Sequence, residues 1–365
     1  MKFIPISKPS IIQDDIELVS EVLRSGMLVQ GKYVTLFEEE IASYIGVSDA
    51  VLVSNGTASM HIMLKALCIG EGDEVIVPAF SYVATANVVE LVGAVPVFVD
   101  ICKRTFNIDV AGIQSKITPK TRAVLAVHEF GLPADVFELK EICDSNNILF
   151  LEDAACALGA IASGQMVGSF GHSASFSLHP RKAITSGEGG IITTNDSEFA
   201  EKCRTLRNHG LNLNYGNTGF IEAGFNYRIT DFQAALVHSQ FLRFDKMMLN
   251  KTRIANRYLN EINNPKIQLP ISSPNSNHSW QSFHILLNQI EQKKAISYLN
   301  SKNIGANYGA QCIPAVNYYH NKYKNDFEKD FPNAWNAFKN GLVIPLYEHM
   351  EDPEIDAVIN ELNKM

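Results

Sequence analysis

Between Ala50 and about Ala200 short apolar runs alternate with helical patterns, and this alternation constrains the fold more than any other feature of the chain. Helical patterns, such as residues 84–91 and 136–143, separate runs that are long enough for single strands. Such runs lie at residues 51–54, 74–78, 95–100, 123–128, 148–152, 174–178 and 191–194. Repeated strand–helix units are typical of an α/β protein with a mostly parallel, doubly wound sheet.

The pattern changes near residue 240. A helical pattern runs through residues 229–259, and a Pro-, Ser- and Asn-rich loop follows at residues 269–279. Because 365 residues exceed the usual length of one domain, we expect a large core with a smaller domain beside it. We therefore predict a large domain over residues 1–240 and a small domain over residues 241–365.

Charge and cysteine usage exclude several classes of protein. The net charge of -8 argues against nucleic acid as a partner, because phosphate backbones need clustered Lys and Arg. The six cysteines form no C-x-x-C pair, which indicates a reducing compartment and provides no zinc framework. The first ten residues carry no apolar signal core, and no apolar stretch has the length of a membrane span. We expect a cytoplasmic protein without a membrane partner.

Lys182 lies between the apolar run 174–178 and a Gly-rich turn that leads to the run 191–194. A lysine held at a strand end against buried surface can lose its proton, and the neutral amine is the form that condenses with an aldehyde. A surface lysine before a hairpin explains the same pattern, and for Lys182 taken alone this interpretation is favoured.

Two other strand ends carry groups that suit a ligand. Gly56 follows the first apolar run and opens a helical pattern, where free N–H groups and the helix dipole can bind a phosphate. An ordinary capped strand-to-helix turn fits that pattern equally well. Asp153 ends the run 148–152, where a carboxylate can hold a ring nitrogen protonated or simply cap the next helix.

A loop at residues 224–229 carries Asn226 and Arg228 ahead of a helix that starts near Thr230. The planar guanidinium of Arg228 suits a carboxylate or a phosphate. A lone arginine more often forms a surface ion pair, so the loop by itself does not specify a site.

Together, and in this order, these stretches resemble the DegT/DnrJ/EryC1/StrS family of sugar aminotransferases, which are pyridoxal-phosphate enzymes of fold type I. The resemblance covers nearly the whole chain, from residues 4–9 to residues 342–346 and the terminal helix. It implies an aspartate-aminotransferase-like fold, with a mostly parallel seven-stranded sheet in the large domain and a smaller α+β C-terminal domain.

The resemblance also implies a role for each candidate residue. Lys182 is similar to the Schiff-base lysine that shuttles protons, and Asp153 to the partner of the pyridine nitrogen. The other cofactor contacts that it implies are Thr57, Ala58 and Ser177 at the phosphate, Asn226 lent to the phosphate across a dimer interface, and Tyr82 stacked on the ring.

Cys156 departs from the family pattern. Many members have a glutamine there that reaches the ring hydroxyl of the cofactor, and a thiol is a weak hydrogen-bond partner. That contact is therefore either weakened or supplied by water. On the substrate side the resemblance implies that His128 and His179 line the site and that Arg228 binds the donor carboxylate or a sugar-nucleotide phosphate.

The implied reaction moves an amino group from glutamate to a nucleotide-linked keto-deoxy sugar, in a homodimer with composite active sites. The run 182–190 resembles the branch that aminates C4, and products of this kind serve O-antigen, lipopolysaccharide and other polysaccharide biosynthesis. A C3-specific sugar aminotransferase, a cyclitol aminotransferase, a sugar dehydratase and a non-catalytic sensor of pyridoxal phosphate are the alternatives. The dehydratases carry histidine where this chain has Lys182. The nucleotide, the sugar and the pathway stay open, because specificity loops carry no readable code.

Overall fold

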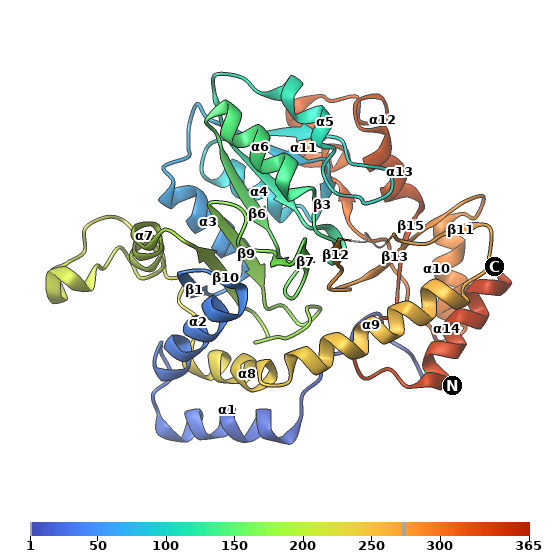
Figure 1. The fold of residues 1–365 in the computed structure, drawn as a ribbon, viewed down its shortest axis with the longest axis horizontal. Coiled ribbons are helices and arrows are strands. Elements are labelled where there is room, and N and C mark those ends of the chain that lie inside the picture. Colours follow the sequence, from blue (N-terminus) through green and yellow to red (C-terminus); the bar gives the residue numbers. More distant parts are fainter. Residues whose placement is uncertain (1, 272–274) are drawn as a thin grey trace.

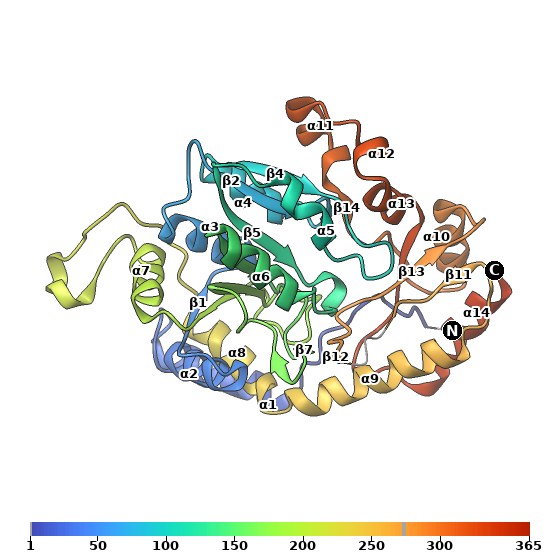
Figure 2. The ribbon, with the colours of Figure 1, turned by 45° about the horizontal axis from the view of Figure 1, so that its top comes forward.

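A seven-stranded sheet forms the centre of the computed structural model, which describes residues 2–271 and 275–365 (Figures 1 and 2). Its strands follow the order β1–β10–β9–β6–β5–β2–β4. Their bounds are β1 Asp49–Val53, β2 Glu74–Pro78, β4 Val95–Val99, β5 Thr121–Val127, β6 Leu149–Asp153, β9 Ser173–Ser177 and β10 Gly190–Thr194. Strands β4, β2, β5, β6 and β9 are parallel, and β10 runs antiparallel to both β9 and β1. The seven apolar runs all lie in this sheet, so the predicted fold class is confirmed.

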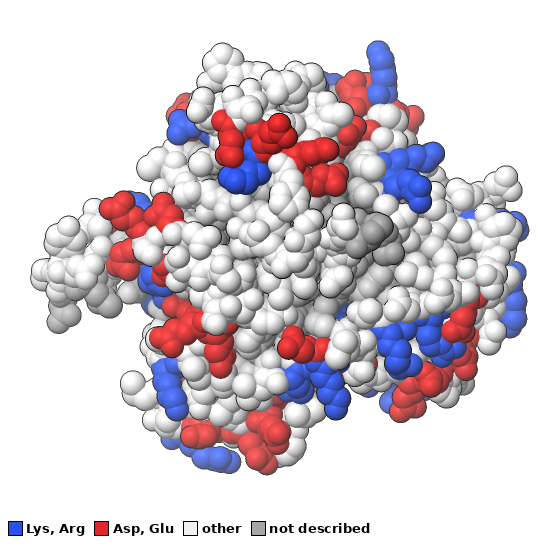
Figure 3. All heavy atoms as spheres, viewed as in Figure 1, with Lys and Arg blue, Asp and Glu red and all other residues white. Residues whose placement is uncertain are grey.

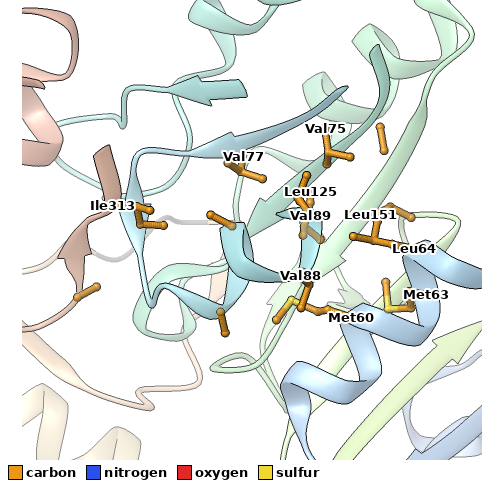
Figure 4. Packing of buried hydrophobic residues seen from close by; sticks show 14 of the residues in the cluster. Met60, Met63, Leu64, Val75, Val77, Val88, Val89, Leu125, Leu151 and Ile313 are labelled. Atoms are coloured by element: carbon orange, nitrogen blue, oxygen red, sulfur yellow. The ribbon is translucent and has the colours of Figure 1, made fainter. Parts of the chain in front are cut away.

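Helices cover both faces of the sheet because its central strands bury both sets of side chains. Val75 and Val77 of β2 pack with α3 (Gly56–Ala66) and α4 (Ala84–Leu91), as Figure 4 shows. Ile76, between them, points to the other face and packs with α6 (Val136–Asn146). Successive residues of a strand point to opposite faces, and the unbroken apolar run of β2 therefore fills two cores at once.

The helical pattern at residues 229–259 forms two helices instead of one. Helix α8 (Asp231–Phe241) ends before Arg243, and α9 (Phe244–Glu261) begins directly after it. Arg243 binds the buried carboxylate of Asp15 with both terminal nitrogens, at 2.8 and 2.7 Å. Its backbone leaves helical geometry there, at φ -117° and ψ 12°. A contact with the N-terminal helix α1 (Gln13–Ser25), remote in sequence, thus accompanies the break.

A smaller unit contains the three-stranded antiparallel sheet of β11 (Ile267–Gln268), β13 (Phe283–Leu287) and β15 (Gly341–Ile344). Helices α10 (Gln292–Ser301) and α14 (Asp352–Lys364) and the second half of α9 pack on it. Ile4 joins the same core, because its N–H donates to Asn303 O at 2.8 Å. The N-terminal segment therefore packs against this unit, and the domain boundary near residue 240 stays a prediction.

The remaining elements connect these two units or cover their edges. They are α2 Lys32–Ile45, β3 Phe80–Ser81, α5 Val110–Ile113, β7 Ile161–Ala162, β8 Gln165–Met166, α7 Ser197–Arg207, β12 Ser276–Asn277, β14 Gln311–Cys312, α11 Asn317–Tyr323, α12 Phe327–Asp330 and α13 Pro332–Asn340. Acidic and basic side chains are interspersed on the face drawn in Figure 3. Among the described residues, no helix combines the length and the apolar character that a membrane crossing requires.

Candidate active site

The predicted functional groups meet at one edge of the large sheet. Strands β1, β5, β6 and β9 point the same way, so their carboxyl ends lie side by side. Two backbone hydrogen bonds link these ends, from His128 N to Asp153 O at 3.1 Å and from Ala154 N to Ser175 O at 2.8 Å. Gly56, after β1, lies so close to Ser177 that a Cβ on it would stand 3.0 Å from the Ser177 Cβ. The absence of a side chain at Gly56 therefore allows Ser177 to lie beside the start of α3.

The start of α3 has the groups of an anion cradle. The N–H groups of Gly56 and Thr57 lie in the first turn, where the helix itself provides no acceptor. The hydroxyl of Ser177 lies beside them. Ala58 differs from the expectation, because its N–H already donates to the Asn55 side chain at 2.8 Å. The groups at the start of α3 that could hold an anion are therefore those of Gly56, Thr57 and Ser177, and Asn55 is the helix cap.

Asp153 is a buried carboxylate that forms no ion pair with any residue that the structure describes. Its side chain is 4% exposed and accepts hydrogen bonds from Thr85 Oγ1 at 2.7 Å and from Ala155 N at 3.2 Å. Burial raises its pKa, and the Thr85 hydrogen bond and the charge of Lys182 oppose that shift. Residues 154–160 form turns and no helix, so Asp153 does not cap a helix. A protonated ring nitrogen would supply the missing charge.

Lys182 lies on the turn after β9 and lines a pocket at the same edge of the sheet. The pocket lining includes Cys156, Ser177 and Lys182, and the Lys182 Nζ donates to the Cys156 Sγ at 3.1 Å. Burial raises the pKa of Cys156, although the nearby charge of Lys182 lowers it. Cys156 is therefore a thiol at neutral pH. Because it lies beside the Lys182 amine, it can also contact a carbonyl group that reacts with this amine.

The two histidines expected to line the site differ in their environment. His128 is fully buried: its Nδ1 accepts from Ala134 N at 3.0 Å, so its Nε2 carries the proton and donates to Glu152 Oε2 at 3.0 Å. Both ring nitrogens are engaged within the protein, and this geometry leaves no atom of His128 for a substrate. His179 is half-buried, its Nδ1 accepts from Arg181 N at 3.2 Å, and burial lowers its pKa. Its Nε2 is the atom that suits a substrate contact.

Tyr82, Asn226 and Arg228 lie at the periphery. Tyr82 is 66% exposed, and Asn226 is also exposed. The Arg228 Nη1 donates to Asn208 Oδ1 at 2.7 Å. The loop that carries Asn226 and Arg228 passes beside the turn between β1 and α3 of its own chain. A hydrogen bond from Ser54 N to Tyr227 O, at 2.8 Å, joins the two segments. This contact fits a role within the same chain as well as across an interface.

Two residues at the site were not predicted from the sequence. Thr85, in the first turn of α4, holds Asp153. Glu129, directly after His128, is 5% exposed, and within the described part of the chain its buried Oε2 has no hydrogen-bond partner. The sequence does contain a signal for Glu129. This carboxylate lies between a strand end and an aromatic-glycine turn, and such positions face ligands in α/β sheets. Thr85 has no comparable signal, because a threonine in an apolar helix reads as a packing residue.

Pyridoxal phosphate fits this donor set. Its phosphate suits the N–H groups at the start of α3, its ring nitrogen suits Asp153, and its aldehyde suits the amine of Lys182. The close approach of Gly56 to Ser177 and the burial of Asp153 without a cation in contact with it are the structural observations that support the fit.

Comparisons with known proteins agree with this site. The model of the DegT/DnrJ/EryC1/StrS aminotransferase family matches residues 9–363. The spore coat polysaccharide biosynthesis protein SpsC of Bacillus subtilis (strain 168) is 36% identical, over 98% of this chain and 95% of its own length. A GDP-perosamine synthase of Vibrio cholerae is 33% identical, over 98% of this chain and 97% of its own.

Solved structures show the same likeness. The PLP form of a sugar aminotransferase, Spr1654 of Streptococcus pneumoniae, superposes with a TM-score of 0.95 at 27% identity, covering 99% of this chain and 98% of that one. PseC of Helicobacter pylori superposes with a TM-score of 0.94 at 27% identity, covering 100% and 99%. The chain therefore belongs to the DegT/DnrJ/EryC1/StrS aminotransferase family, and it is a pyridoxal-phosphate-dependent aminotransferase.

Proposed function

We propose that this enzyme transfers an amino group from glutamate to C4 of a nucleotide-linked keto-deoxy sugar. Lys182 carries the proposal, because it provides an amine in the pocket that also contains Ser177 and Cys156. The dehydratase alternative would need histidine at that position, and loss of Lys182 or Asp153, both of which are present, would mark a sensor without turnover. Two relatives are named GDP-perosamine synthase, and PseC is described as acting in pseudoaminic acid biosynthesis, which supports a sugar as the acceptor.

The residues of the chain divide the catalytic work among them. Bound pyridoxal phosphate supplies an electron sink for the charge that develops at the donor α-carbon. Asp153 would keep the ring nitrogen protonated, since its buried carboxylate is stabilised by a cationic partner. Gly56, Thr57 and Ser177 would hold the phosphate. The Lys182 amine would anchor the cofactor and then, once released, would take the proton from the donor α-carbon and deliver it to the carbon of the cofactor aldehyde.

The substrate groups have candidate partners around the pocket. The guanidinium of Arg228, fixed at one end by Asn208, would bind the donor carboxylate or a phosphate of the nucleotide. The Nε2 of His179 would face the sugar. The six cysteines are unpaired in the structure, and we place the enzyme in the reducing cytoplasm on that ground.

We further propose that the enzyme is a homodimer with composite sites. The segment beyond α7 projects from the body of the molecule on the left of Figure 1. It exposes Tyr215, Phe220 and Ile221, and the connection between α1 and α2 exposes Met27 and Val29. Large apolar side chains gathered on projecting segments suit an interface between subunits. Asn226 and Arg228 lie at the base of the projecting segment, so the dimer contact would bring them to a site.

A panel of keto-sugar nucleotides, incubated with the loaded enzyme and glutamate, tests the reaction. We expect amino sugar to form with at least one UDP-, dTDP- or GDP-linked 4-keto sugar, and NMR of the product should place nitrogen at C4. The Lys182→Ala variant is the matched control and should form none. Nitrogen at C3, or turnover only with a cyclitol ketone, would replace the C4 assignment by one of the alternatives.

A further inference from the structure

Glu129 is a buried glutamate at the edge of the sheet that carries Asp153. It follows β5 by two residues, and Val127, the last residue of β5, pairs with Asp153. The Glu129 N–H donates to Asn107 Oδ1 at 2.8 Å, and Phe130 after it adopts φ 55°. These contacts hold the backbone of Glu129 in place at the carboxyl edge of the sheet. The side chain is 5% exposed, and its buried Oε2 has no hydrogen-bond partner among the residues that the structure describes.

The electrostatic surroundings of Glu129 are those of the active site itself. Burial and, to a smaller extent, the charge of Asp153 raise its pKa to about 8, against the opposing effect of the Lys182 charge. Cys156 also feels the charge of Glu129. His278 and His284 share a small cavity with Glu129, and burial lowers the pKa of each to about 3, so both are neutral. At neutral pH the carboxyl is therefore protonated and can donate a hydrogen bond.

One polar substituent of the pyridoxal phosphate ring, its hydroxyl group, has no partner yet among the residues assigned above. Its phosphate, ring nitrogen and aldehyde suit α3, Asp153 and Lys182, and its ring hydroxyl stands next to the aldehyde, between the aldehyde and the nitrogen. A partner for that hydroxyl must lie near both Lys182 and Asp153. Two groups meet this condition by position: the Cys156 Sγ lies 3.1 Å from the Lys182 Nζ, and Glu129 comes two residues after Val127, which pairs with Asp153. A thiol is a weak donor, and a carboxylic acid is a strong one.

We propose that Glu129, as a neutral carboxylic acid, donates a hydrogen bond to the ring hydroxyl oxygen of bound pyridoxal phosphate. The ring oxygen carries negative charge when the neighbouring aldehyde is attached to an amine, and a neutral donor stabilises it. An ionised Glu129 would repel that oxygen and Asp153 together. The inference depends on cofactor binding at this edge of the sheet and is independent of which sugar the enzyme aminates.

The test measures cofactor affinity, with no donor or sugar present. The chain freed of cofactor is titrated with pyridoxal phosphate, and the visible absorbance band reports binding, on both sides of pH 8. Glu129→Gln keeps a donor but cannot ionise, and Glu129→Leu removes the donor. We expect Glu129→Leu to bind about ten- to hundredfold more weakly at neutral pH, as for a hydrogen bond to a charged group. We expect the wild-type affinity to fall as the pH passes about 8, and the Glu129→Gln affinity to lack this step.

A rescue variant controls for damage to the fold. Because the Cys156 Sγ lies 3.1 Å from the Lys182 Nζ, an amide introduced by Cys156→Gln can reach the same oxygen. The double variant Glu129→Leu/Cys156→Gln should regain most of the lost affinity. Wild-type affinity in Glu129→Leu, or the same pH step in Glu129→Gln, would overturn the proposal. A changed KM for glutamate with unchanged cofactor affinity would also overturn it and assign Glu129 to the substrate. None of these results depends on which sugar the enzyme aminates.

Discussion

Replacing Asp153 by asparagine isolates the charge that the cofactor ring needs. The carboxylate accepts from Thr85 Oγ1 at 2.7 Å and from Ala155 N at 3.2 Å, and an asparagine oxygen can keep at least one of these bonds. The fold should therefore survive the change. The neutral side chain cannot hold a ring nitrogen protonated, so the cofactor should lose most of its strength as an electron sink.

The size of the effect follows from the burial of the site. Two unit charges at hydrogen-bond distance, ~3 Å, interact by about 5 kcal/mol at an effective dielectric constant of ~20. That effective constant suits Asp153, which is 4% exposed. Since each 1.36 kcal/mol corresponds to about a factor of ten in rate, Asp153→Asn should lower the rate of the chemical step by about 10³ to 10⁴.

A single-turnover assay separates this effect from product release. Loaded enzyme is mixed with glutamate, and the loss of the visible cofactor band gives the rate of the first half-reaction. Thr85→Val is the matched control, because it keeps the charge and removes one hydrogen bond to it; we expect about a tenfold loss. If Asp153→Asn slowed the half-reaction only a few-fold, no more than Thr85→Val, the residue would orient the local turn and the electrostatic argument would be refuted.

Three further changes test other parts of the site. Lys182→Ala should still bind the cofactor through its phosphate but lose the visible band of the attached form and all transamination; residual activity near wild type would contradict its role. Mixed under subunit exchange, Lys182→Ala chains and Asn226→Ala/Arg228→Ala chains should regain part of the activity, and proven exchange without recovery would confine both residues to their own site. Glu152→Gln should cost about 3–5 kcal/mol in urea unfolding, because the buried carboxylate accepts from three backbone N–H groups and from His128. A loss of unfolding free energy under 1 kcal/mol would show that an amide at position 152 satisfies these hydrogen bonds as well as the carboxylate does.

For three segments the tertiary contacts differ from what the sequence led us to expect. His128 ends a strand as predicted, but whether its ring faces a ligand or the interior depends on Glu152 of the neighbouring strand. Ala58 was expected at the cofactor phosphate, and its N–H instead donates to the side chain of Asn55, which caps the helix. The helical pattern through residue 242 gave no sign of a break, because the partner of Arg243 is Asp15, more than two hundred residues earlier.

Local pattern determined the strands, the turn at Gly56 and the positions of Asp153 and Lys182. A short unbroken apolar run specifies a buried strand from neighbouring residues alone, and parallel strands place their carboxyl ends at one edge whatever the side chains are. Only the tertiary structure decided which of those side chains remain available. Burial, the charge of neighbouring groups and the presence of a hydrogen-bond partner arise between segments remote in sequence. For that reason the sequence marks Glu129 only by its place after a strand end, and the folded chain shows that its carboxyl is buried and that the charges of Asp153 and Lys182 act on its pKa.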